Sequence, residues 1–216
     1  MVFLYRLIMG SIFYISDTLP PASIDEMKAF FANIFHNNNS LIVEIGSGNG
    51  HFLVERALKY PDNNYIGTDL LTGRAKKFYS KIEKRGLKNI VVFKGDARRF
   101  VWEFLYENTV EEFIILFPDP WPKQRHRKHR LLTAAFINML KIRLVPGGMV
   151  TLATDYHEYR NRILDEFRKD RGFTNIYRNG YSSSPHSCPK TLFQEKYTEE
   201  GRDIYYMRFR KERDLR

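Results

Sequence analysis

The sequence contains a single cysteine, Cys188, among its 216 residues. One thiol excludes an internal disulfide framework and a zinc site built from several cysteines. The six histidines show no spacing with carboxylates that is typical of metal ligands, so we expect no metal cofactor. Long apolar runs are also missing, and no window is long and apolar enough to span a bilayer.

The most apolar terminal stretch is residues 1–15, and it is interrupted by polar, basic and glycine residues. It has one basic residue, Arg6, and no small-residue cleavage pattern, so we interpret it as a packing segment or arm and not as a targeting signal. We therefore expect a soluble, cytoplasmic protein with no membrane partner. The length suits one domain over 1–216, with an N-terminal arm and first helix in 1–40 and the core of the domain in 41–216.

The chain is basic, with a formal net charge of +10, and this charge is unevenly distributed. Residues 1–70 contain four basic and seven acidic side chains, a net charge of −3, which leaves +13 for residues 71–216. The densest block, Lys123 to Arg130, has five permanent positive charges and no acid. Such a block favours a polyanionic partner, and nucleic acid in particular, over a merely solvated surface.

Short apolar runs alternate with helical periodicity, which is typical of βαβ units and a parallel sheet. We expect strands at 41–45, 65–68, 90–93, 113–117 and 149–153, and helices at 53–58, 71–82, 102–106, 132–140 and 159–167. Gly86 is expected to end the second of these helices, and Pro146-Gly147-Gly148 to follow the fourth. Segments 173–177 and 204–209 also resemble strands but have no clear crossover helix between them, which predicts an antiparallel closing hairpin. The fold class is therefore α/β.

A glycine-rich turn, Gly46-Ser47-Gly48-Asn49-Gly50, follows the first of these strands, and Glu44 precedes it. Asp69 and Asp96 follow the next two strands. Glycines permit tight turns and close approach of a ligand, and the carboxyl edge of a parallel sheet is where such folds bind ligands. The alternative, a strand–helix turn without a ligand, does not account for acids at consecutive strand ends.

A dinucleotide fingerprint requires a third glycine at position 51, which is His51 here, so nicotinamide-dependent oxidoreduction is disfavoured. The surrounding acids suit a ligand with a ribose and a positive centre but no phosphate, and S-adenosylmethionine has these features. The strand, loop, ribose acid and late hairpin together resemble the class I methyltransferases. That resemblance implies a Rossmann-like three-layer sandwich, with a seven-stranded, mostly parallel sheet and a C-terminal antiparallel hairpin.

The fourth predicted strand is followed by Phe117-Pro118-Asp119-Pro120-Trp121-Pro122-Lys123, where three prolines restrict the backbone. This restricted backbone would hold Asp119 and Trp121 over the cofactor edge. Positioning of the reacting groups contributes a large part of the catalysis of methyl transfer. This loop and the basic block resemble the signature of the tRNA (guanine-N7)-methyltransferases of the bacterial single-chain type. The resemblance implies methylation of the variable-loop guanosine at tRNA position 46, with S-adenosylhomocysteine as the other product.

The resemblance also implies roles for particular residues. Asp119 would be the catalytic residue and also a cofactor ligand. The other cofactor-binding positions would be Glu44, Gly46, Gly48, Gly50, Asp69, Asp96 and Ala97. The substrate and RNA-binding positions would be Lys123, Arg125, His126, Arg127, Lys128, His129, Arg130, Asp155, Thr191, Phe193, Gln194 and Glu195. Gln194 stands where an acid is more usual, which leaves open whether Gln194 or Glu195 contacts the guanine. A monomer or homodimer with no obligatory protein partner is expected.

Guanine N7 carries a lone pair and no proton, so its methylation requires no general base. Asp119 is therefore better interpreted as an electrostatic stabiliser or an orienting group. Methylation of another RNA base is an alternative, but adenine N6 chemistry favours Asp/Asn-Pro-Pro-aromatic, from which Asp119-Pro120-Trp121-Pro122 departs. A non-catalytic RNA-binding module is a second alternative, and it would predict loss of the acids that are all present here.

Overall fold

The computed structural model describes residues 12–184 and 200–213. These residues form one eight-stranded sheet, and its order is β1-β4-β3-β2-β5-β6-β8-β7. The strands are β1 (Ile12–Tyr14), β2 (Leu41–Ile45), β3 (Asn64–Asp69), β4 (Ile90–Lys94), β5 (Val110–Leu116), β6 (Leu144–Thr154), β7 (Phe173–Asn175) and β8 (Tyr205–Lys211). The helices are α1 (Ile24–Phe35), α2 (His51–Lys59), α3 (Thr72–Arg85), α4 (Ala97–Glu103), η1 (Gln124–His129, a 3-10 helix), α5 (Ala134–Arg143) and α6 (His157–Lys169).

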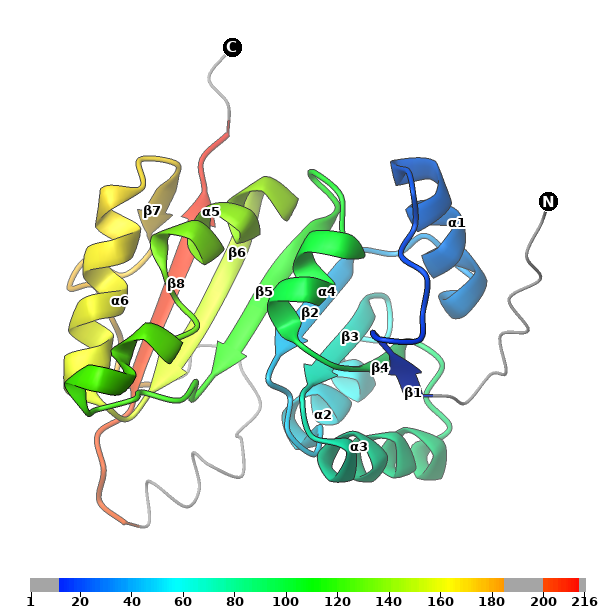
Figure 1. The fold of residues 1–216 in the computed structure, drawn as a ribbon, viewed down its shortest axis with the longest axis horizontal. Coiled ribbons are helices and arrows are strands. Elements are labelled where there is room, and N and C mark those ends of the chain that lie inside the picture. Colours follow the sequence, from blue (N-terminus) through cyan, green and yellow to red (C-terminus); the bar gives the residue numbers. More distant parts are fainter. Residues whose placement is uncertain (1–11, 185–199, 214–216) are drawn as a thin grey trace.

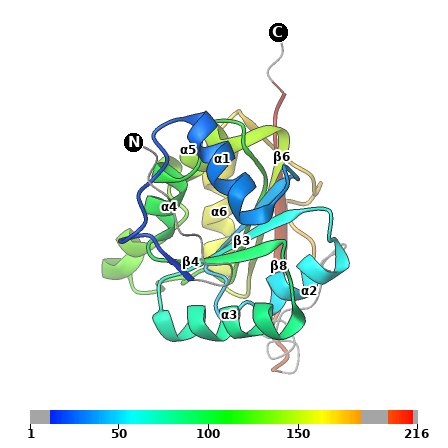
Figure 2. The same cartoon turned by 90° about the vertical axis from the view of Figure 1, so that its right-hand side faces the viewer.

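Successive side chains of a strand point to opposite faces of the sheet, so these buried strands carry apolar side chains on both faces, and helices cover both. Val43 and Phe93 share one cluster with α1, α4, α5 and α6, whereas Ile42 and Val92 share a second cluster with α2 and α3. The two groups of helices can be followed in Figure 1 and, turned by 90°, in Figure 2. The three-layer α/β architecture expected from the sequence is confirmed.

Pairing directions also confirm the expected sheet. Strands β1 to β6 pair in parallel, and β8 pairs antiparallel with both β6 and β7. The sheet has eight strands and not seven, because β1 adds to the outer side of β4. Ile15, which follows β1, donates its backbone N–H to the Lys94 carbonyl at 2.9 Å and is buried.

Several boundaries differ from the sequence prediction by a few residues, among them β5, which begins at Val110, and β7, which ends at Asn175; two differences are larger. The helix expected at 102–106 is α4 and begins earlier, at Ala97, because the Asp96 side chain caps it by accepting from the Arg99 N–H at 3.0 Å. The turn expected at Pro146-Gly147-Gly148 lies inside β6, which starts at Leu144 and pairs with Val110 across a register shift. The stop at Gly86 is confirmed, with φ of 62° at the C-cap of α3.

Candidate active site

The glycine loop after β2 adopts the left-handed backbone conformation that its sequence permits. Gly46, Gly48 and Gly50 have φ of 74°, 57° and 70°. A Cβ on Gly50 would lie 1.9 Å from the Phe78 ring, so this glycine allows α2 and α3 to pack closely. A Cβ on Gly46 or Gly48 would meet no atom within 4 Å, so the space above these two residues is open to a ligand.

Asp69 ends β3 and is tied to this loop. Its Oδ2 accepts the Gly48 N–H at 2.9 Å, and its Oδ1 accepts the Leu71 N–H at 2.8 Å. The side chain is buried, and Arg74 of α3 lies 3.9 Å from Oδ2. Two backbone donors leave further acceptor capacity on the carboxylate, so Asp69 can also accept from ribose hydroxyls.

Glu44 lies within β2, one residue before the strand ends. It is buried, and its Oε2 has no hydrogen-bond partner among the described residues. Burial raises the pKa of Glu44 from 4.5 to about 8, the charge of Arg56 opposes this shift, and the charge of Asp69 adds to it. A buried carboxyl with a free oxygen is costly unless a partner arrives, so the site has an open position for a cationic or hydrogen-bonding group.

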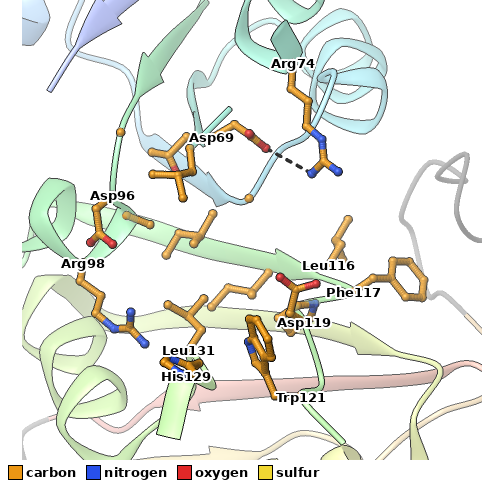
Figure 3. Close-up of a pocket in the computed structure, with 18 residues that line it drawn as sticks. Asp69, Arg74, Asp96, Arg98, Leu116, Phe117, Asp119, Trp121, His129 and Leu131 are labelled. Atoms are coloured by element: carbon orange, nitrogen blue, oxygen red, sulfur yellow. Dashed lines mark ion pairs between the residues drawn. The ribbon is translucent and has the colours of Figure 1, made fainter. Parts of the chain in front are cut away.

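A cavity of about 230 Å³ lies at the carboxyl ends of the parallel strands (Figure 3). Its lining includes Gly46, Asp69, Asp96 and Ala97 from the predicted cofactor positions, together with Asp119. His129, from the predicted RNA-binding positions, and Trp121, expected over the cofactor edge, also line it. The wall further contains residues that the sequence reasoning did not select, namely Ile45, Thr68, Leu70, Arg74, Gly95, Arg98, Ile115, Leu116, Phe117, Pro118 and Leu131. Of these, Leu70, which directly follows the predicted site residue Asp69 and is 64% exposed, is the one that sequence position could have indicated.

The loop between β5 and η1 carries Asp119 into this cavity. Its two residues with positive φ, Phe117 at 51° and Trp121 at 41°, flank Asp119, and each precedes a proline. Such backbone angles are uncommon outside glycine and require support from neighbouring groups. Phe117 is held by its N–H, which donates to the Ala153 carbonyl at 2.8 Å. In Figure 3 the carboxylate of Asp119 and the indole of Trp121 point into the cavity.

The basic block is divided in its placement. Lys123, Arg125, Arg127 and Lys128 are all exposed, and Arg127 also forms an ion pair with Glu158 of α6. The rings of His126, which is half-buried, and His129, which is exposed and lines the cavity, lie 5.7 and 5.3 Å from that of Trp121. Arg130 is buried.

Asp155, expected at the substrate site, follows β6 and is ion-paired with Arg202 at 2.9 Å. It does not line the cavity that contains Asp119. The late segment expected to contact the guanine, with Thr191, Phe193, Gln194 and Glu195, lies outside the described residues.

Comparisons with known proteins identify the family. A family model described as "Putative methyltransferase" matches residues 38–207. The tRNA (guanine-N(7)-)-methyltransferase of Nitrosococcus oceani is 32% identical over 183 residues, which are 85% of this chain and 76% of that protein. The enzyme of the same name from Chlamydia felis is 33% identical over 180 residues, 81% of this chain and 77% of that protein. The chain belongs to the tRNA (guanine-N7-)-methyltransferase family.

Solved structures support the fold alone. The 16S rRNA methyltransferase KamB has a TM-score of 0.61 at 14% identity, covering 85% of this chain and 93% of that chain. A putative methyltransferase from Streptococcus mutans in complex with SAH has a TM-score of 0.53 at 16% identity, covering 87% and 97%. The α/β methyltransferase fold of the family is therefore present over most of the chain.

The acceptor groups at and beside the cavity fit the cofactor of a methyltransferase. S-adenosylmethionine carries an ammonium, a sulfonium and a ribose, and Asp69 in the cavity wall is an acceptor. Glu44 does not itself line the cavity, but it lies one residue before Ile45, which does, and its buried Oε2 has no hydrogen-bond partner among the described residues. The open space above Gly46 and Gly48 admits a ligand to the backbone. Groups of three or more metal-ligating side chains are not found in the described ranges, and no helix there is long and apolar enough to cross a membrane.

Proposed function

We propose that this protein transfers a methyl group from S-adenosylmethionine to N7 of a guanosine in tRNA, and that the target is the variable-loop guanosine at position 46. The observation that carries the proposal is the single cavity that joins Asp69 and the glycine loop to Asp119 and Trp121. Next to it, on η1, the exposed Arg125 and Lys128 present positive charge. Cofactor acids and RNA-directed cations are thereby adjacent at one edge of the sheet.

Each cofactor-side residue has a distinct task in this proposal. Asp69 accepts from the ribose hydroxyls, and Glu44 compensates the positive end of the cofactor. Gly46, Gly48 and Gly50 give the backbone shape that lets the ligand approach, while Asp96 and Ala97 close the cavity on the α4 side. The bound cofactor supplies an electrophilic methyl group on a sulfonium.

The acceptor side works by orientation and electrostatics. Guanine N7 attacks through its lone pair, so the chain need not remove a proton, and the base becomes positively charged. Asp119, whose carboxylate points into the cavity, stabilises that developing charge and orients the base. Trp121 lies in the same wall and either stacks on the base or closes the pocket.

Substrate binding is proposed to involve residues on both sides of the cavity. Lys123, Arg125 and Lys128 contact phosphates, which position RNA without specifying its sequence. Asp155 accepts from the N–H edge of the guanine, together with Thr191, Phe193 and either Gln194 or Glu195. The chain is proposed to act as one domain in the cytoplasm, as a monomer or homodimer with no obligatory protein partner.

The decisive experiment incubates the protein with labelled S-adenosylmethionine and unmodified tRNA, followed by mapping of the product. N7-methylguanosine is cleaved by heat and aniline, so we expect label on the tRNA and one cleavage in the variable loop. A tRNA with adenosine at position 46 is the matched control and should remain unlabelled. Label without aniline cleavage would exclude N7 while retaining a methyltransferase, and label on the control tRNA would exclude position 46.

A further inference from the structure

The basic block does not present one uniform charged surface, because residues 124–129 form a 3-10 helix. Such a helix has three residues per turn, so side chains three apart lie in the same row. Arg125 and Lys128 form an exposed row, and His126 and His129 form a row against Trp121. Arg127 and, one turn later, Arg130 form the third row, which is directed at α6.

Arg130 is unlike the other arginines of the block because it is only 6% exposed. Its Nε donates to the Pro120 carbonyl at 2.7 Å, and its Nη2 donates to the Trp121 carbonyl at 3.4 Å. The guanidinium also lies 5.0 Å from the centre of the Tyr159 ring of α6. A buried cation needs such partners, so these donors are engaged inside the protein and are directed away from an RNA phosphate.

The two carbonyls that Arg130 holds belong to the loop that carries Asp119. Trp121 has φ of 41° and precedes Pro122, a conformation that the loop does not adopt without external support. The Phe117 N–H secures one end of this loop to β6, and Arg130 secures the other. Arg98 of α4, which lines the cavity, donates in turn to the Arg130 carbonyl at 3.1 Å.

We propose that Arg130 is a positioning residue that sets the conformation of the Asp119–Trp121 loop, and that it does not contact RNA. Its effect on methylation rests on the proposed function, whereas its effect on the loop does not. A phosphate contact requires only positive charge, which lysine supplies. Two diverging carbonyls and an aromatic face require the planar guanidinium, which lysine cannot replace.

The test replaces Arg130 with lysine in a Trp102→Phe background. Trp102 and Trp121 are the two tryptophans of the chain, so the fluorescence of this background reports Trp121 alone. We expect Arg130→Lys to shift the Trp121 emission and increase its quenching by acrylamide. We also expect kcat to fall by about 10- to 100-fold, since misplacement of reacting groups by about 1 Å has effects of that size. The KM for tRNA should change by less than about threefold.

Two controls distinguish positioning from RNA contact. Arg125→Ala removes an exposed arginine of the same helix, and it should raise the KM for tRNA and lower the salt dependence of binding by roughly one phosphate contact. Arg85→Lys, an exposed arginine at the end of α3, should leave every readout unchanged. Arg130→Lys with unaltered Trp121 fluorescence and unaltered kcat would overturn the proposal, as would an increase in the KM for tRNA alone.

The fluorescence measurement needs neither cofactor nor tRNA, so it remains decisive if the protein methylates some other substrate. Should Arg130→Lys fail to fold, Arg98→Ala provides a second test, because it removes an exposed side chain that supports the Arg130 carbonyl. A smaller shift of Trp121 emission in the same direction is expected. No shift in Arg98→Ala would contradict the proposal.

Discussion

The Gly48 N–H donates to Oδ2 of Asp69 at 2.9 Å, and this bond joins the glycine loop after β2 to the end of β3. Asp69→Ala therefore removes both the proposed ribose acceptor and the anchor of the loop. We expect the Kd for S-adenosylmethionine to rise by about 10- to 100-fold, because hydrogen bonds to a charged group contribute roughly 1.5–3 kcal/mol. Titration calorimetry measures this change, and Asp62→Ala, at an exposed turn, is the control. Equal affinities for the two variants would exclude the ribose role.

Gly46 and Gly50 share a left-handed backbone but differ in their surroundings, so alanine substitutions at the two positions should have opposite consequences. Gly50→Ala places a methyl group into the Phe78 ring, and we expect the free energy of unfolding to fall by about 2–4 kcal/mol, from strain and overpacking. Gly46→Ala meets no atom, so its stability cost should be about 1 kcal/mol while cofactor affinity is lost. Urea unfolding and cofactor titration distinguish these outcomes, and equal destabilisation of both variants would contradict them.

The raised pKa of Glu44 predicts a specific dependence of stability on pH. The folded ligand-free protein keeps a proton on Glu44 up to about pH 8, whereas the unfolded chain releases it near 4.5. The folded state therefore binds more protons, and the Glu44 contribution to stability falls as pH rises from about 4.5 to about 8. Glu44→Gln has no proton to release and so lacks this decrease. The free energy of unfolding of Glu44→Gln relative to that of the native chain should therefore increase from about pH 4.5 to about pH 8 and stay constant above pH 8.

Urea unfolding of the ligand-free protein between pH 5 and pH 9 measures this difference. Glu107→Gln, at an exposed turn, is the control and should show no such trend. A constant difference between Glu44→Gln and the native chain at all pH values would show that Glu44 is ionised in the folded state.

Asp119→Asn tests the stabilising role of the acceptor loop. The amide retains the size and much of the hydrogen-bonding capacity of the side chain but loses its negative charge. We expect kcat to fall by about 100-fold, in the range of other electrostatic contacts to a developing charge. The Kd for the cofactor should change by less than about threefold. Single-turnover methylation of tRNA provides the rate, and near-normal turnover with intact cofactor affinity would remove the catalytic role.

The sequence predicts the central strands well because they are buried on both faces. Leu41–Ile45 is fully buried, so it appears in the sequence as a continuous apolar run that one polar residue, Glu44, interrupts. Strand β1 has only three residues at the sheet edge, and its pairing with β4 is a long-range event that local pattern does not encode. The extended β6 is missed for a related reason, since Pro146 and the following glycines resemble a turn when the partner strand is not known.

The candidate site shows the same division. The acids at strand ends are predictable, because the carboxyl edge of a parallel sheet is defined by topology. The inward direction of Arg130 cannot be predicted from the sequence, because Arg125, Lys128 and Arg130 all carry the same positive charge. The exposed Arg125 and the buried Arg130 are distinguished only by the three-residue period of η1 and by the carbonyls near Arg130, which are features of the structure.

The position of β8 also bears on what happens to incomplete copies of the chain. This strand comes last among the elements described, yet it lies between β6 and β7. A chain released before Tyr205 would leave the edge of β6 from Met149 to Thr154, six mostly buried residues, without its partner. An uncovered edge of that length pairs readily with other chains. Premature termination would therefore produce material that self-associates and burdens chaperones and proteases, and not merely a weaker enzyme.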